Sequence, residues 1–264
     1  MKVKHLVGAF LCVLGCYACS SPKTEVQSPD GHIKMTLTVD ENGKPFYNVS
    51  VDDSLLIENS AMGFTAANGI ILGEGFQVKN TTFSSEDETW TQPWGENKKN
   101  RNHYNEMAVN LTNEDHVQLT LRFRVFDDGI GFRYEYTVPT VDSLLITDEL
   151  TTFRFHRDGT SWSIPASAET YELLYQQQPI SEVETANTPF TFKTADGVYG
   201  SIHEAALYDF PEMTLKQIGH YTLKAELAPW PDGIKARKGN HFTTSWRTCL
   251  LYTSPSPRDQ RGSR

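Results

Sequence analysis

Hydrophobic and polar residues alternate with a period of two along much of the chain. In residues 117–125 every second side chain is Val, Leu or Phe, and those between are Gln, Thr or Arg. This spacing predicts a β-strand with one buried face. Residues 127–129, Asp-Asp-Gly, form a turn sequence, and residues 130–138 alternate again, so the two segments are predicted to pair as an antiparallel hairpin.

The same alternation predicts strands elsewhere in the chain. They lie at residues 33–39, 47–51, 55–57, 151–155, 190–193, 199–203, 213–218 and 221–227. Asn-Gly or Asp-Gly pairs at 42–43, 196–197 and 232–233 mark turns. Helical periodicity is almost absent, so the predicted fold class is all-β, an antiparallel β-sandwich.

One polar stretch, residues 84–103, does not alternate and carries Trp90 and Trp94. It is predicted to be a long irregular loop. Such loops in compact domains are usually functional or disordered, and the aromatic residues favour a functional role.

Composition narrows the classes of protein to which the chain can belong. Its 264 residues are 38% hydrophobic and carry a net charge of −9. That length is enough for one or two folded cores. The acidic balance argues against a nucleic-acid partner, because phosphate binding needs clustered Lys and Arg.

The four cysteines do not form a disulfide framework. Cys12, Cys16 and Cys19 lie in the first nineteen residues, and Cys249 lies near the other end. Residues 1–19 combine a basic start with a short apolar run, which predicts an export signal peptide and is too short for a transmembrane helix. Residues 20–27 are predicted to be a linker.

The signal peptide has two candidate lipidation sites, Cys16 and Cys19, each preceded by a sequence resembling a bacterial lipobox. Ordinary cleavage after Ala18 is an alternative, and so is a cytosolic protein with an apolar first helix. We expect an exported protein, periplasmic or anchored in the outer membrane of a Gram-negative bacterium, which touches a membrane only through a lipid anchor.

The last residues, 249–264, depart from the acidic composition that precedes them. Cys249 to Asp259 reads as the translation of a transposase-type sequencing adapter, although a natural Ser/Pro-rich tail is the alternative. We therefore expect the natural domain to span residues 28–248 and its own C-terminal continuation to be replaced here.

Motifs that carry chemistry are sparse. The sequence has no nucleophile elbow, phosphate loop or HExxH motif, and its histidines share no metal-ligand spacing. The segment 162–175 combines aromatic residues with Glu169 and Glu172. Either carboxylate could bind calcium or a sugar, or could simply be solvated.

Several blocks in combination resemble a known family. They are Phe-Arg-Val-Phe-Asp-Asp-Gly-Ile-Gly-Phe-Arg-Tyr at 123–134, Trp-Ser-Ile-Pro to Tyr-Glu-Leu-Leu-Tyr at 162–175, His-Glu-Ala-Ala-Leu-Tyr-Asp-Phe-Pro at 203–211 and Ser-Trp-Arg-Thr at 245–248. The chain resembles the N-terminal domain of glycoside hydrolase family 97, which contains α-glucosidases and α-galactosidases. The resemblance implies a β-super-sandwich of the galactose-mutarotase type, packed against a catalytic (β/α)8 barrel.

The resemblance also implies a role for individual residues. In that family the catalytic residues come from the barrel, so none is expected here. A calcium ion is held by Glu side chains, one of them from the N-terminal domain, and this position maps to Glu172, with Glu169 as the second choice. Trp94, Glu96 and Glu204 are candidates for lining the domain interface or the sugar pocket.

Three functions follow as hypotheses. The first is the N-terminal domain of an exported, calcium-dependent α-glycosidase that acts on an α-linked oligosaccharide; this chain alone would be inactive. The second is a stand-alone sugar-binding lipoprotein that uses Trp90 and Trp94. The third, a mutarotase, needs a positioned acid and base, and no such pair stands out in the sequence.

Overall fold

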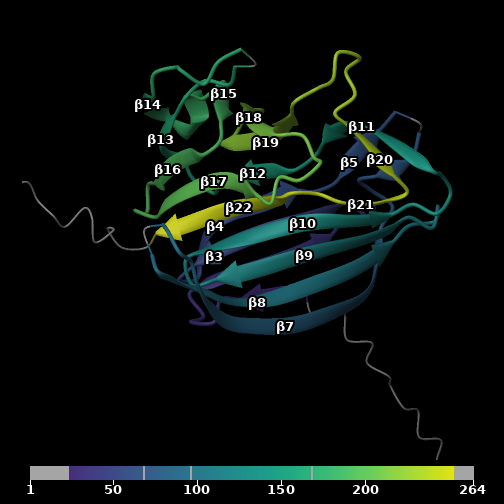
Figure 1. The fold of residues 1–264 in the computed structure, drawn as a ribbon, viewed down its shortest axis with the longest axis horizontal. Coiled ribbons are helices and arrows are strands. Elements are labelled where there is room, and N and C mark those ends of the chain that lie inside the picture. Colours follow the sequence, from purple (N-terminus) through teal and green to yellow (C-terminus); the bar gives the residue numbers. More distant parts are fainter. Residues whose placement is uncertain (1–23, 68, 96, 168, 253–264) are drawn as a thin grey trace, which may run out of the picture.

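The computed structural model describes residues 24–67, 69–95, 97–167 and 169–252, and the regular structure there is almost entirely β (Figure 1). In these residues the helical structure is one short 3-10 turn, η1 (Ile180–Glu182). No helix in the described ranges has the length and apolar character to span a membrane. The chain therefore has the predicted fold class, an all-β sandwich.

The largest sheet has ten strands in the order β14-β13-β16-β17-β22-β10-β9-β8-β7, with β21 paired to the end of β10. Neighbouring strands are antiparallel. The strands are β7 (Gln77–Thr91), β8 (Lys99–Thr112), β9 (Gln118–Phe126), β10 (Gly129–Thr137), β13 (Gly159–Ser163), β14 (Gln176–Pro179), β16 (Phe190–Thr194), β17 (Tyr199–Ala205), β21 (His241–Thr243) and β22 (Trp246–Tyr252).

Three four-stranded sheets complete the fold, in the orders β1-β2-β3-β4, β20-β11-β5-β6 and β12-β19-β18-β15. Their strands are β1 (Glu25–Gln27), β2 (Ile33–Val39), β3 (Pro45–Val51), β4 (Ser54–Ala61), β5 (Phe64–Ala66), β6 (Ile71–Leu72), β11 (Ser143–Glu149), β12 (Thr152–Arg154), β15 (Thr185–Asn187), β18 (Met213–Gln217), β19 (Thr222–Leu227) and β20 (Ala236–Gly239).

In Figure 1, β3 and β4 lie behind the ten-stranded sheet, β18 and β19 lie above β17, and β5, β11 and β20 lie at the right-hand end. One continuous hydrophobic core joins the layers. Aromatic contacts join the layers at its centre. The rings of Tyr47 on β3 and Phe132 on β10 lie 5.0 Å apart, as do those of Phe64 on β5 and Tyr134 on β10. The outer face of the ten-stranded sheet, which faces the viewer in Figure 1, is left uncovered by these layers.

The hairpin predicted from residues 117–138 is confirmed. Strands β9 and β10 pair in antiparallel register from Phe126 opposite Gly129 to Thr137 opposite Gln118. Leu121 and Phe123 are fully buried, and Arg122 and Arg124, which alternate with them, lie on the outer face. Alternation along this hairpin therefore reports which side chains enter the core.

The predicted turn at Asn42 and Gly43 also forms, between β2 and β3. Gly43 has a φ of +73°, a left-handed conformation that side chains disfavour. A Cβ atom at Gly43 would lie 2.3 Å from the backbone nitrogen of Phe76, so the close approach of two backbone segments also requires glycine there.

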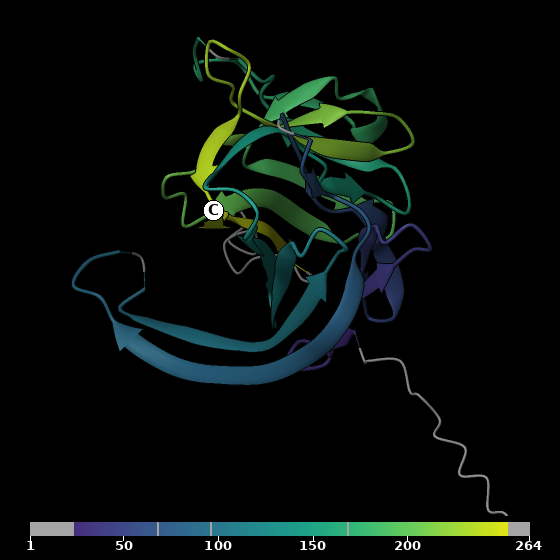
Figure 2. The ribbon, with the colours of Figure 1, turned by 90° about the vertical axis from the view of Figure 1, so that its right-hand side faces the viewer.

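The prediction of an irregular loop at 84–103 is wrong. Strands β7 and β8 form a long hairpin that continues to Thr91 opposite Lys99, and Figure 2 shows it curving away from the rest of the molecule. We call residues 84–102 the arm. Both faces of the arm lie outside the core and are polar, so its strands have no reason to alternate.

The sheets extend beyond both predicted domain boundaries. Strand β1 lies in the stretch predicted as a linker, because Val26 is buried opposite Met35. Strand β22 continues past residue 248, where Cys249 and Leu251 both enter the core. That residues from 249 onward derive from an adapter stays a prediction.

Candidate functional site

The segment that the sequence singled out forms an exposed loop between β13 and β14, which we call the 164–175 loop. Its aromatic and aliphatic side chains point to solvent: Tyr171, Leu173, Leu174 and Tyr175 are all exposed. Residue 168 lies outside the described residues. A loop that holds large apolar side chains in water is a common feature of contact surfaces.

Glu169 and Glu172 both lie on this loop and are exposed. Two hydrogen bonds between residues close in sequence fix the backbone of the loop. The N–H of Glu169 donates to the hydroxyl of Ser167 at 3.2 Å, and the N–H of Glu172 donates to the hydroxyl of Thr170 at 3.0 Å. Neither carboxylate has a partner among the described residues. Both are therefore free to bind a cation.

A side-chain hydrogen bond ties this loop to the connection between β17 and β18, residues 206–212. The hydroxyl of Tyr171 donates to the carboxylate of Glu212. This bond to an anion raises the pKa of Tyr171. Leu207 and Tyr208, on the same connection, are also exposed, so the two loops together present an apolar surface next to Glu172.

Beneath the 206–212 connection lies a buried ion-pair network. Arg247 on β22 is fully buried and makes two hydrogen bonds to Glu149, from Nε at 2.9 Å and from Nη2 at 2.5 Å. Its Nη1 donates to Glu204 on the neighbouring strand β17 at 2.6 Å and to the hydroxyl of Ser245 at 2.8 Å. One guanidinium thus joins three strands.

The two carboxylates compete for this one cation. Burial raises the pKa of Glu204, and the attraction of Arg247 offsets only part of that effect. Burial by itself opposes the charge of Arg247, yet Glu149 raises the pKa of the guanidinium above its ordinary value. The other Glu204 oxygen accepts the Met213 N–H at 3.0 Å, so this carboxylate also fixes the end of the 206–212 connection.

The other predicted site residues lie apart from this loop. Trp90 and Trp94 belong to the arm, with 49% and 84% of their surfaces exposed. In Figure 2 the arm extends to the lower left, whereas the 164–175 loop lies at the top of the molecule. Glu96, Cys16 and Cys19 lie outside the described residues. The structure therefore groups Glu169, Glu172 and Glu204 in one region and separates Trp94 from them.

The outer face of the ten-stranded sheet carries a cluster that the sequence analysis missed. The Trp246 ring lies beneath two guanidinium groups, those of Arg124 at 4.7 Å and Arg133 at 4.8 Å. Ion pairs with Glu106 and Glu135 hold these arginines in place. Alternation in β9 predicts that Arg124 faces outward. Its contact with Trp246 has no signal in the local sequence, because the two residues are more than a hundred positions apart.

Metal-binding side chains do not gather within the described part of the chain, where no group of three or more His, Cys, Asp or Glu could hold an ion. Calcium takes six to eight oxygen ligands. Glu172 and Glu169 have the correct donor atoms, but by themselves they fill only part of such a shell. A calcium site that included them would need further oxygen ligands from outside the described residues.

The Glycosyl-hydrolase 97 N-terminal family model matches residues 26–257. A retaining alpha-galactosidase from Bacteroides thetaiotaomicron is 25% identical over 246 residues, which cover 87% of this chain and 36% of the relative.

Solved structures give the same relation. A glycoside hydrolase family 97 enzyme from Pseudoalteromonas sp. strain K8, solved in complexes with panose and with acarbose, has a TM-score of 0.83 and 37% identity over 86% of this chain and 35% of that one. A beta-arabinopyranosidase, with a TM-score of 0.78 and 20% identity over 86% of this chain and 40% of its own, shares the fold. The chain spans little more than a third of the length of these relatives.

Proposed function

The chain belongs to the glycosyl-hydrolase 97 N-terminal family, and from this premise we propose that it is the N-terminal domain of an exported, calcium-dependent α-glycosidase. In this proposal the domain supplies one calcium ligand and packs against a catalytic barrel, and the whole enzyme acts on an α-linked oligosaccharide. Relatives that support it are a retaining alpha-galactosidase and an enzyme solved with panose and acarbose.

The observation that carries the proposal is the free carboxylate of Glu172. It lies on a loop whose backbone is fixed by the Thr170 hydroxyl and whose neighbour Tyr171 is held by Glu212. Such a loop can present an anionic oxygen to an ion held mainly by another domain. A bound calcium ion would supply a fixed positive charge that orients carboxylates and polarises substrate oxygen atoms.

The surface around Glu172 supports packing against a second domain. Leu174, Tyr175 and Tyr208 are exposed on the two joined loops, and Trp230 is exposed on the β19–β20 connection that adjoins residues 209–211. Large apolar side chains gathered on one region of a soluble protein mark contact sites. We assign this surface to the barrel.

Export is part of the proposal and rests on residues 1–19 alone. Their basic start and apolar run support a signal peptide, and Cys16 or Cys19 would carry the lipid. Metabolic labelling of the expressed chain with a tritiated fatty acid tests this. If the label is lost in Cys19→Ala but retained in Cys16→Ala, Cys19 carries the lipid. If the wild-type chain is not labelled, the protein is not lipidated, and the soluble periplasmic form is the remaining alternative.

The calcium role can be tested in a chimera. Residues 24–252 of this chain replace the matched N-terminal region of the Pseudoalteromonas enzyme, and hydrolysis of an aryl α-glucoside is followed as calcium is titrated. We expect Glu172→Gln to raise the calcium concentration required at least tenfold. Glu169→Gln, on the same exposed loop, is the matched control and should leave the titration unchanged.

The outcomes separate the alternatives. If Glu169→Gln shifts the titration and Glu172→Gln does not, the ligand is Glu169. A titration that neither substitution moves contradicts the calcium role. The chain by itself should not hydrolyse aryl α-glucosides or α-galactosides, and turnover by the purified chain would refute the assignment of catalysis to a separate domain.

A stand-alone sugar-binding protein is the second candidate, favoured by the exposure of Trp90 and Trp94 on the arm. It predicts saturable binding of starch or galactoside oligomers to the isolated chain, weakened by Trp94→Ala. Calorimetry that detects no heat of binding for either class of oligomer would exclude it.

A further inference from the structure

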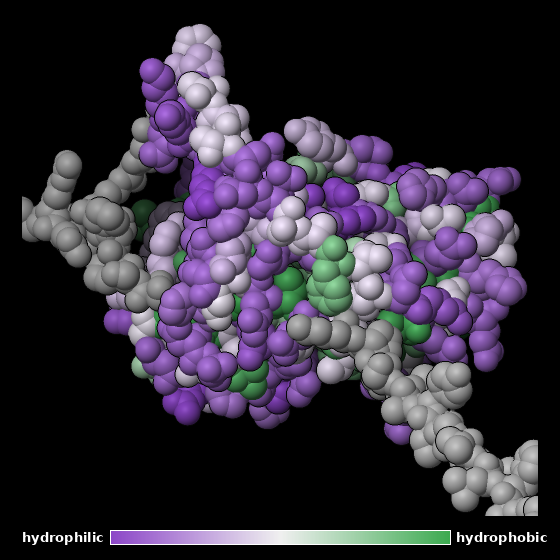
Figure 3. Space-filling view, turned by 90° about the horizontal axis from the view of Figure 1, so that it is seen from below, coloured by the Kyte–Doolittle hydropathy of each residue, from purple (hydrophilic) through white to green (hydrophobic). Residues whose placement is uncertain are grey.

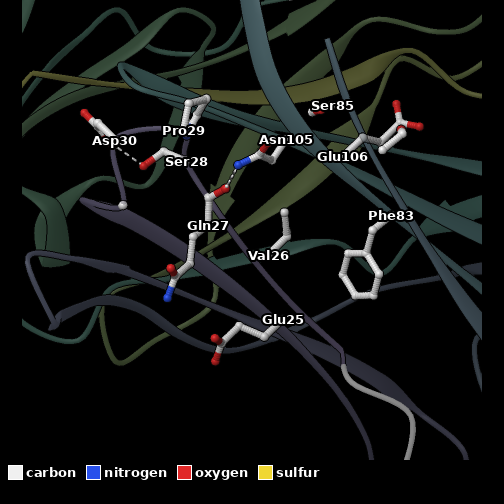
Figure 4. Close-up of a pocket in the computed structure, with 12 residues that line it drawn as sticks. Glu25, Val26, Gln27, Ser28, Pro29, Asp30, Phe83, Ser85, Asn105 and Glu106 are labelled. Atoms are coloured by element: carbon white, nitrogen blue, oxygen red, sulfur yellow. Dashed lines mark hydrogen bonds between the residues drawn. The ribbon is translucent and has the colours of Figure 1, made fainter.

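A groove lies between the edge strand β1 and the base of the arm, away from the 164–175 loop. Its volume is about 680 Å3, within the roughly 300–1,000 Å3 typical of small-molecule sites. Seen from below, the molecule is mostly hydrophilic, with small hydrophobic patches scattered among the polar residues (Figure 3). Figure 4 shows the groove, where Val26 lies between the ring of Phe83 and the side chains of Glu25 and Gln27.

Phe83 gives the groove its apolar wall. The residue lies opposite Met107 and on the same face of the hairpin, yet Met107 is fully buried whereas 51% of Phe83 is exposed. The arm leaves the core at this point, so the inner layer no longer covers the ring. An aromatic ring with one free face can stack against the C–H face of a pyranose ring.

Polar groups around the ring have unused hydrogen-bonding capacity. The Glu25 carboxylate, the Gln27 amide and the hydroxyls of Ser84 and Ser85 have no partner among the described residues. The Nδ2 group of Asn105 donates a hydrogen bond to the backbone carbonyl of Gln27 at 2.9 Å, and the side-chain oxygen of Asn105 remains available as an acceptor. Donors and acceptors therefore lie around an apolar surface, the combination that suits a sugar with its hydroxyl edge and apolar face.

The charge of the lining narrows the class of ligand. Among the described residues that line the groove there is no Lys, Arg or His, whereas Glu25, Asp30 and Glu106 are acidic. Both Glu106 oxygens are already paired with Arg122 and Arg124. A phosphorylated or carboxylated ligand would be repelled, so a neutral polyhydroxy compound fits best.

We propose that this groove is a binding site for a neutral oligosaccharide, with Phe83 as the stacking platform and Glu25, Gln27 and Asn105 as hydrogen-bonding groups. The site goes beyond the proposed role in calcium binding, because it contains neither Glu172 nor any residue of the 164–175 loop. It would hold a glycan chain on the domain at a distance from the calcium ligand.

The test uses the chain itself and isothermal titration calorimetry with panose, and separately with raffinose as an α-galactoside, each up to about 10 mM, a range suited to weak sites. We expect saturable binding of at least one trisaccharide. Phe83→Ala should lower its affinity by at least about fivefold, as for the loss of one aromatic contact, whereas Phe83→Tyr should retain it.

Tyr199→Ala is the matched control, because it removes another exposed aromatic residue, one on β17 outside the groove, and should leave the affinity unchanged. Trp94→Ala is measured beside it to test the end of the arm. Each variant is first shown by thermal unfolding to keep the wild-type fold. Chemical-shift changes of the Val26 methyl groups and the Phe83 ring on titration provide an independent readout of the position of the sugar.

Three results would overturn the proposal. They are the absence of saturable binding by either sugar, binding that Phe83→Ala leaves unchanged, and binding that Trp94→Ala abolishes. The last would place the sugar on the arm tip instead. Since the assay contains no catalytic domain and no calcium, its outcome is independent of the calcium titration of the chimera.

Discussion

Two neighbouring hairpins of the ten-stranded sheet, β9–β10 and β7–β8, differ in what holds them. The first buries one face in the core, with Leu121, Phe123 and Phe132 fully enclosed. In the second, β7 leaves the core at Phe83, and both faces of the arm lie outside the core. Arg101 and Asp87 pair across the arm, as do Asn102 and Glu88. Alternation of apolar residues therefore reports burial of one face of a strand and not the presence of the strand itself.

The largest effect should come from removing the cation at the buried end of this sheet. Arg247→Ala leaves Glu149 enclosed without a partner, and breaking a buried pair in this way typically costs about 3–5 kcal/mol. The free energy of unfolding, measured in urea, should fall by that amount. Arg247→Lys keeps the charge but loses the bidentate geometry, so it should lie between Arg247→Ala and the wild-type chain.

Core packing of the first hairpin should come next. Leu121→Ala removes a fully buried side chain and should destabilise the fold by about 2–5 kcal/mol in the same urea titration. Trp90→Ala, which removes a half-exposed residue of the second hairpin, should cost much less. A comparable loss of stability would show that the arm belongs to the cooperative core, and the two hairpins would then not differ.

The pH dependence should distinguish the buried network from the surface. Since the pKa of Glu204 is raised in the folded chain, the fold binds a proton there more tightly than the unfolded chain does. Its contribution to stability is therefore fully present below the ordinary glutamate pKa of 4.5 and declines as the pH rises through the higher folded value. In urea titrations from pH 4 to pH 8, the stability of the wild-type chain relative to Glu204→Gln should decrease over that window.

Glu169→Gln provides the control for that series, because it removes an exposed carboxylate that has no partner in the described part of the chain. Its stability relative to the wild-type chain should not show the same decline. If the stability of the wild-type chain relative to Glu204→Gln instead increased from pH 4 to pH 8, attraction to Arg247 would outweigh the effect of burial on the pKa of Glu204.

The smallest effect should come from the end of the arm. Trp94 is 84% exposed, and substitutions at such sites usually change stability by less than about 0.5 kcal/mol. Trp94→Ala should therefore leave the urea midpoint unchanged. Hydrogen exchange sharpens the same contrast: amides of residues 84–91 should exchange through local opening, and those of residues 118–126 only through global unfolding.

The contrast between the hairpins also explains which parts of the fold the sequence could predict. The β9–β10 and β2–β3 hairpins follow from alternation and turn residues. The arm was predicted as a loop because neither of its faces is buried, and β1 was missed because a three-residue strand with one apolar side chain carries almost no pattern.

The site divides in a similar way. Glu169 and Glu172 could be chosen from the family resemblance, and the structure shows that both carboxylates are free. The link between Arg247 and Glu149 could not be predicted, because the two residues are 98 positions apart and only the folded sheet brings them together. No role is assigned to Arg247 from the sequence, and its burial becomes evident only from the inward position that it takes on β22.

The position of β22 has a consequence for how the domain is made. This strand fills the gap between β10 and β17 in the middle of the largest sheet, although it is the last strand in sequence among the described residues. Until residues 246–252 have been synthesised, β10 and β17 lack the neighbour that pairs with these edges, and Glu149 lacks the guanidinium of Arg247. Such edges favour aggregation. The nascent chain should therefore depend on holding factors until this segment emerges, after which the sheet can close in a single cooperative step.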